Sequence, residues 1–211
     1  SERSRGLGDV YKRQGLDGSN RTRWMITGAN GNLGKRLLQN LLLNADTEVV
    51  ALVRSERAKS QIEELPLEPQ QRSRLDVVIA DYASKQDLEA AAEGVNYCVH
   101  LVGILKETPD STYENAHEDS CRALTEALQG GSAAHISYVS IVGALETATN
   151  RCLKSKSIAG DMLLKSTTKA MVLRVPMVLG EGDYASYALR RNARKSLNFL
   201  FRPSSMDQPL Y

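Results

Sequence analysis

The sequence predicts an α/β protein built on a doubly wound parallel sheet. Short apolar, β-branched runs alternate with segments of helical periodicity from Arg23 onward. Such alternation is typical of βαβ units, in which helices cover both faces of a parallel sheet. A glycine-rich loop joins the first run to the first helical segment, and the 211 residues are enough for one domain with a full core.

Six runs are expected to form the strands. They read RWMIT (23–27), EVVALVR (48–54), LDVVIADY (75–82), VNYCVHLVG (95–103), HISYVSIVG (135–143) and AMVLRVP (170–176). The second run is continuously apolar, as expected of a strand that is buried on both faces.

Helices are expected between these strands. In the segment after the glycine-rich loop, one face carries Leu33, Leu37, Leu38, Leu41 and Leu42. The residues SKQD (84–87) resemble a capping box, and Gly94 is placed to end the helix that they start. Further helices are expected over about 113–129 and 151–166, and a basic helix after a loop that follows Pro176.

The two ends of the chain differ from the rest. The stretch SRGLGDVYKRQ resembles the translation of a common sequencing adapter, so we expect residues 1–14 to be an artefact and 15–22 a linker. The nucleotide-binding domain is expected over 23–186. Residues 187–211 would begin a substrate-side region that is incomplete, because DQPLY is not followed by a closing element.

Charge and cysteine content exclude several classes of protein. A net charge of +2 is too small to suggest nucleic-acid binding, and Arg190, Arg191 and Arg194 are interpreted as a solvated helix face. The three cysteines show no metal-ligand spacing and suit a reducing cytosol. Because no run could span a membrane, we expect a cytoplasmic protein.

The loop TGANGNLG carries the first functional signal. Gly28 permits a tight turn, Gly31 lets the backbone approach a pyrophosphate, and Gly34 lets the helix pack close to the sheet. The helix N-terminus then offers free N–H groups and the positive end of its dipole to phosphates. The alternative is a glycine-rich turn that binds nothing.

The end of the second strand favours NADP(H) over NAD(H). NAD-binding proteins place an acidic residue there to hold the ribose 2′-hydroxyl, whereas this chain has Arg54, with Arg57 nearby. An arginine can pair with a 2′-phosphate and stack on adenine. The alternative is a surface arginine that starts a helix. Asp81 and Tyr82 are placed to meet the adenine edge, although Asp81 could instead cap a turn.

The spacing TGxxGxxG, the third-strand DY and the run HLVGILKETPDSTYENAHEDSCRALTEAL together resemble the short-chain dehydrogenase/reductase superfamily, in its atypical or extended branch. The segments HLVGIL and YENAH look like the dehydrogenase-like accessory subunit of respiratory complex I and its bacterial relatives. The segment LRVPMVLGEGD looks like the one that folds over the nicotinamide. The likeness covers about residues 23–186 and implies a Rossmann-like fold, bound NAD(P), and a site above the carboxyl edge of the sheet.

The resemblance also implies roles for individual residues. The pyrophosphate would be lined by Thr27, Gly28, Asn30, Gly31, Asn32 and Leu33. The adenosine phosphate would meet Arg54, and the adenine Asp81 and Tyr82. The nicotinamide half would lie on Leu101, Val102 and Gly103, be held at its ribose by Lys156, and be flanked by Pro176 and Met177.

The catalytic residues of that superfamily are incomplete in this chain. Its mechanism uses a tyrosine four residues before a lysine on one helix face, so that the lysine lowers the phenol pKa. Here the tyrosine position holds Cys152, which is too short to reach the phenol position and is interpreted as a small, half-buried helix residue. Ser140 ends the fifth strand, although the family's hydroxyl often lies later, at Ile141 or Val142.

Other proton donors are less favoured by the sequence. Tyr184 and Tyr187 could supply an acid from the opposite wall, but nothing in the sequence places them there. His117 is interpreted as a packing or capping residue, and His100 as lying next to the core.

Two functions remain open at this stage. The first is a reductase or isomerase that uses NAD(P)H, a non-standard acid, and Lys156 and Ser140 as catalytic residues. The second is a non-catalytic NADPH-binding protein that supports a structure or reports redox state to a protein partner. Both bind a dinucleotide, and the sequence names neither the small-molecule substrate nor the partner.

Overall fold

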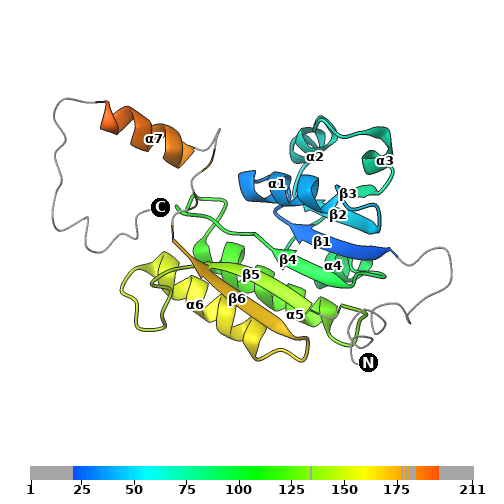
Figure 1. Cartoon of the computed structure of the whole chain (residues 1–211). Helices are drawn as coiled ribbons and strands as arrows, with labels where there is room; N and C mark the ends of the chain where they lie inside the picture. The colour runs from blue at the N-terminus through cyan, green and yellow to red at the C-terminus, as the bar shows by residue number, and fades with distance from the viewer. Residues whose placement is uncertain (1–20, 134, 177, 179, 181–183, 195–211) are drawn as a thin grey trace, which may run out of the picture.

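A six-stranded, all-parallel sheet forms the centre of the protein (Figure 1). The computed structural model describes residues 21–194 except 134, 177, 179 and 181–183. The strands are β1 (Thr22–Thr27), β2 (Thr47–Val53), β3 (Leu75–Ile79), β4 (Tyr97–His100), β5 (His135–Ile141) and β6 (Ala170–Val175). Their order is β3-β2-β1-β4-β5-β6, which confirms the doubly wound, Rossmann-like fold expected from the sequence.

Helices cover both faces of the sheet. They are α1 (Asn32–Leu41), α2 (Glu56–Glu63), α3 (Pro69–Arg72), α4 (Lys85–Ala91), the π-helix η1 (Glu114–Asp119), α5 (Ser120–Leu128), α6 (Arg151–Leu164) and α7 (Tyr184–Ala193). One apolar core joins α1 and α2 to β1, β2 and β3. A second core joins α4, α5 and α6 to the opposite face. In the described part of the chain, no helix combines the length and apolarity needed to cross a membrane.

The helix boundaries agree in part with the sequence. Ser84 caps α4 through Asp87 N–H, and Gly94 follows that helix with φ +69°, as expected. The short helix α3 was not expected, and a helix at α2 was expected only in the alternative in which Arg54 starts a helix, since neither carries a long apolar period. The helix expected over 113–129 begins instead as a π-helix, and only Ser120–Leu128 is α-helical.

The carboxyl ends of all six strands meet at one edge of the sheet. The strand order reverses between β1 and β4, which pair directly with each other. Loops after these two strands therefore diverge to opposite faces and leave a crevice, which is where open α/β sheets bind ligands.

Candidate functional site

The start of α1 packs so closely on the glycine loop that follows β1 that position 34 has no room for a side chain. Gly28 has φ +69°, a left-handed conformation that glycine adopts without strain. A Cβ atom on Gly34 would lie 2.6 Å from the carbonyl oxygen of Ala29 and 2.7 Å from that of Gly28. Helix α1 therefore begins hard against the loop, and Gly31 stands at its N-cap.

Tyr82 holds this loop in place through its hydroxyl group. Its hydroxyl donates a hydrogen bond to Leu52 O (2.7 Å) and accepts one from Gly28 N–H (2.9 Å). The side chain is only 5% exposed, and burial raises the pKa of the phenol to about 12. The hydroxyl of Tyr82 is thus engaged by the protein backbone, while its ring forms part of a cavity wall.

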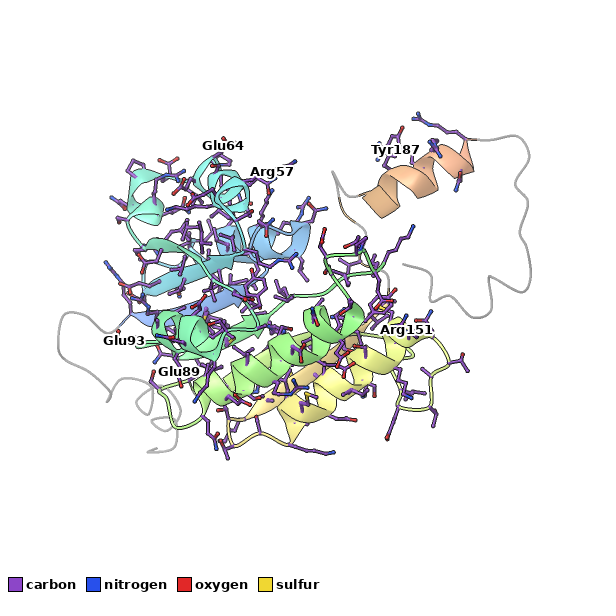
Figure 2. The ribbon with its side chains drawn as sticks, turned by 180° about the vertical axis from the view of Figure 1, so that it is seen from behind. Arg57, Glu64, Glu89, Glu93, Arg151 and Tyr187 are labelled. Carbon is purple, nitrogen blue, oxygen red and sulfur yellow. The ribbon has the colours of Figure 1, made fainter. Side chains whose placement is uncertain are left out.

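A cavity of about 270 Å³ lies at the expected adenosine end of the crevice, and its walls include Arg54, Asp81 and Tyr82. The guanidinium carbon of Arg54 stands 5.9 Å from the centre of the Tyr82 ring. Asp81 caps a turn, since its Oδ1 accepts a hydrogen bond from Ala83 N–H (2.9 Å). Arg57, the second residue of α2, lies at the outside of the molecule (Figure 2).

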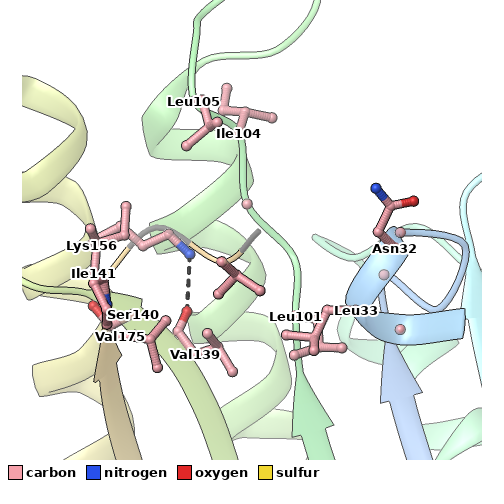
Figure 3. Close-up of a pocket in the computed structure, with 16 residues that line it drawn as sticks. Asn32, Leu33, Leu101, Ile104, Leu105, Val139, Ser140, Ile141, Lys156 and Val175 are labelled. Atoms are coloured by element: carbon pink, nitrogen blue, oxygen red, sulfur yellow. Dashed lines mark hydrogen bonds between the residues drawn. The ribbon is translucent and has the colours of Figure 1, made fainter. Parts of the chain in front are cut away.

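A second cavity, of about 310 Å³, lies where the nicotinamide end would be (Figure 3). Its walls bring together residues that are far apart in sequence: Gly28, Gly31, Asn32 and Leu33 of the loop, Leu101 and Gly103 after β4, Ser140 of β5, Lys156 of α6 and Pro176 after β6. The sequence predicted each of these positions as part of a site. The structure gathers them around one space.

Three other predicted positions lie elsewhere. Thr27 is fully buried, and its hydroxyl contacts His100 Nδ1 (2.7 Å), so it supports the loop from the core side. Asn30 donates to Gln61 Oε1 (3.4 Å). Val102 is buried beside the smaller cavity. Met177 lies outside the described residues.

Sequence reasoning missed the apolar part of this wall. The larger cavity is also lined by Ile104, Leu105, Ile141, Val175 and Val178. All of them belong to strand ends or the loops that follow, so the rule that parallel sheets bind ligands at their carboxyl edge could have located them.

Lys156 is a buried cation at the cavity wall. It is 7% exposed, and its Nζ lies 3.4 Å from both Val102 O and Val139 O. The same Nζ lies 4.7 Å from the centre of the Tyr138 ring. Among the described residues, no carboxylate forms an ion pair with it. Burial therefore lowers the pKa of the ammonium to about 8.

Ser140 and Cys152 flank this lysine differently. Ser140 is 1% exposed, lines the cavity, and its Oγ has no hydrogen-bond partner in the described part of the chain. The Cys152 thiol is 3% exposed, and its Sγ lies 3.6 Å from Ile104 O. Cys152 is therefore a buried helix residue, as the sequence indicated.

Two neutral histidines support the floor of the cavity. His117 Nε2 accepts a hydrogen bond from Ile104 N–H (3.1 Å), which fixes the loop after Gly103. A Cβ on Gly103 would lie 2.7 Å from Lys156 Nζ and 3.4 Å from His117 Nε2. Burial lowers the pKa of His117, and that of the core residue His100, to about 3. Both are packing residues, as expected, and both are uncharged at neutral pH.

These features fit a dinucleotide. The segment Leu101–Gly103 lies between the two cavities, since Leu101 and Gly103 line the larger one and Val102 lines the smaller one. Helix α1 has no acidic residue in its first turn and, in the described structure, no side-chain cap on Gly31, so its first N–H groups remain for phosphate oxygens. Lys156 supplies donors at one end and Arg54 at the other.

Comparison with known proteins identifies the family. The sequence profile described as NAD(P)H-binding matches residues 28–196. The chain belongs to the NAD(P)H-binding family. That match starts in the glycine loop and runs past the last strand, so it contains both cavities described above.

A curated relative of this NAD(P)H-binding chain is a reductase by name. "Ceramide reductase" of Caulobacter vibrioides (strain NA1000 / CB15N) is 28% identical over 172 residues, which are 81% of this chain and 51% of that protein. The crystal structure of Pen from Bacillus thuringiensis superposes with a TM-score of 0.66 at 18% identity, covering 83% of this chain and 56% of that one.

An NADPH-dependent quinone oxidoreductase of Escherichia coli superposes with a TM-score of 0.56 at 22% identity, over 81% of this chain and 51% of that one. At these identities the two solved structures support the fold. The chain spans about half the length of the relatives named here.

The loop anchor gives the first prediction. Tyr82→Phe leaves Leu52 O and Gly28 N–H without their partner, and it should weaken NADPH binding about tenfold, or ~1.4 kcal/mol, while the fold persists. Isothermal titration calorimetry measures this. Tyr97→Phe is the control, because Tyr97 stacks on Trp24 at the far end of β4. Unchanged affinity in Tyr82→Phe would show that the hydroxyl does not hold the loop.

The buried ammonium gives a prediction on stability. Since the pKa of Lys156 falls from 10.5 to about 8 on folding, the unfolded chain binds more protons between these values, and stability should rise with pH across that window. Lys156→Met should remove this rise and add ~2 kcal/mol to the free energy of unfolding at pH 7. Chemical denaturation at several pH values measures both effects.

Lys154→Met is the matched control, because Lys154 is exposed on the same helix. It should leave the pH dependence unchanged. A lower stability of Lys156→Met at pH 7 would contradict the account.

Proposed function

We propose that this chain is the cofactor-binding part of an NADPH-dependent reductase of the atypical short-chain dehydrogenase type, working in the cytoplasm. One observation carries the proposal: a single cavity is lined by the glycine loop, by Ser140 and by Lys156. These groups are suited to hold the reduced nicotinamide end beside a substrate carbonyl. When bound, NADPH supplies the hydride.

The protein's own groups would divide the work. The N-terminal amides of α1 bind the pyrophosphate, and the Lys156 ammonium donates to the ribose hydroxyls. Ser140 lines the cavity, and its buried Oγ has no hydrogen-bond partner among the described residues, so the hydroxyl would turn toward the cavity to donate to a carbonyl oxygen. The apolar residues after β4, β5 and β6 would exclude water from the reacting atoms.

The cavity wall also favours an apolar substrate. Leu105 and Val178, which line the larger cavity, are 62% and 55% exposed. Val142 and Leu145, which are 52% and 56% exposed, follow β5 at the same edge of the sheet. Exposed apolar side chains gathered at a site indicate an apolar ligand. The Caulobacter relative is named a ceramide reductase, which agrees with a substrate whose carbonyl is carried on a long hydrocarbon chain.

Arg54 supports the preference for NADPH. It lies at the end of β2, over the Tyr82 ring and beside the smaller cavity, where its guanidinium could pair with a 2′-phosphate. The carboxylate that an NAD-binding protein would place at this point is absent from position 54.

A second candidate function rests on Cys152. Since the position of the phenol holds a buried thiol, a non-catalytic NADPH-binding subunit is the alternative, in line with the resemblance to the complex I accessory subunit. Such a protein would bind NADPH and act through a protein partner.

Arg54→Ala tests the cofactor preference. The change should weaken NADPH binding by about 10- to 100-fold and leave NADH binding within about twofold, because only the 2′-phosphate contact is lost. Titration of both cofactors measures this, with Lys59→Ala as a control that removes one charge from the neighbouring helix α2. Tighter binding of NADH than NADPH by the unmodified protein would overturn the preference.

A carbonyl probe separates the two functions. Stopped-flow absorbance at the NADPH band should show oxidation of protein-bound NADPH by 2-decanone, and a much slower reaction with acetone, because the longer chain buries more apolar surface. Stable NADPH in the presence of long-chain ketones, aldehydes and quinones would favour the non-catalytic subunit.

A further inference from the structure

The reduction of a carbonyl needs a proton donor, and the standard one is missing. At the phenol position, Cys152 turns its sulfur toward Ile104 O (3.6 Å), and burial raises the pKa of the thiol. Among the described residues that line the larger cavity, Lys156 and Ser140 are present and Cys152 is not. The thiol therefore does not line the substrate space, and burial keeps it in its neutral, hydrogen-bonded form.

The Lys156 ammonium has a hydrogen-bond donor available to a ligand in the cavity. An ammonium carries three donors, and the two contacts of its Nζ, to Val102 O and Val139 O, are both long at 3.4 Å. The contact with Val139 O is drawn in Figure 3, where Lys156 and Ser140 border the same space. With no carboxylate to hold it in the described structure, at least one N–H remains available to a ligand in the cavity.

The other titratable side chains around Lys156 are not suited to donate this proton. Those that face it from the neighbouring elements are His100 of β4, His117 of η1, Cys121 of α5, Tyr138 of β5 and Cys152 of its own helix. Burial lowers the pKa of both histidines and raises the pKa of both thiols and of the Tyr138 phenol.

All five groups are therefore neutral and poor acids near pH 7. The Lys156 ammonium has a pKa of about 8, which is closer to neutral pH than the pKa of any of these five groups. General acid catalysis is most effective when the pKa of the acid lies near the operating pH.

We propose that Lys156 is itself the general acid. The inference rests on the proposed reductase function and adds the proton source. In the step, the carbonyl carbon receives a hydride and forms a C–H bond. The carbonyl π pair takes a proton from the Lys156 ammonium, and an alcohol results. NADPH is oxidised to NADP⁺, the carbonyl is reduced, and the neutral amine regains its proton from solvent.

The test compares Lys156→Arg with Lys154→Arg in the purified protein. A guanidinium keeps the charge and can still hold ribose hydroxyls, but it does not release a proton near neutral pH. Lys156→Arg should bind NADPH within about threefold of the unmodified protein and oxidise it with 2-decanone at least 100-fold more slowly. Lys154→Arg, on the exposed side of the same helix, should match the unmodified protein in both measurements.

A second readout needs no turnover. In protein labelled with ¹³C at the lysine ε-carbon, the signal lost in Lys156→Arg identifies Lys156. That signal should titrate near pH 8, whereas exposed lysines titrate near 10.4. The rate of reduction should fall with rising pH through the same value.

The outcomes separate the two proposals. Reduction by Lys156→Arg within threefold of the unmodified rate, or titration of Lys156 above pH 10, overturns the acid role and leaves the reductase standing. An unmodified protein that binds NADPH and oxidises none with long-chain carbonyls overturns both.

Discussion

Close packing against the backbone of two glycines is the constraint on which the site depends. Gly34 lets α1 start within contact of the carbonyl groups of Ala29 and Gly28, and Gly103 lets Lys156 and His117 close on the loop after β4. A side chain at either glycine would push the helix or the lysine away. The phosphate-facing amides and the buried ammonium occupy their positions because these glycines leave the space.

Burial then sets the chemistry of the groups that these contacts position. The hydroxyl of Tyr82 is engaged by Leu52 and Gly28, so it stiffens the loop. The imidazoles of His100 and His117 stay neutral because charging them in the core is costly. Burial also makes the charged form of Lys156 less stable, so its ammonium at the cavity wall is more acidic.

Much of the fold could be predicted from the sequence, because its signals are local. The strands alternate with amphipathic helices, and a strand–glycine loop–helix unit carries a specific spacing. The helices α2 and α3 and the π-helix before α5 were not predicted, since none of them carries a long apolar period. Helix α3 buries no residue and is stabilised at its start by Pro69 and by the hydrogen bond from Glu68 N–H to Gln71 Oε1.

The site was predicted less completely for a physical reason. Residues at the ends of parallel strands can be assigned to one edge of the sheet, and Gly31 and Ser140 line one cavity there together with Lys156 of α6. Side-chain direction cannot be assigned in this way. Thr27 faces the core rather than the space expected for the cofactor, and the hydroxyl of Tyr82 binds the loop backbone although Tyr82 also lines the smaller cavity.

Amide hydrogen exchange with and without NADPH tests the central claim most directly, because it reports which backbone segments the cofactor covers. The account predicts slower exchange in residues 28–34 and in 101–104, at the carboxyl edge of the sheet, and no change in the helix turns after α4 and α5 at the opposite edge. Protection that is absent from the glycine loop, or that appears at the opposite edge, would contradict it.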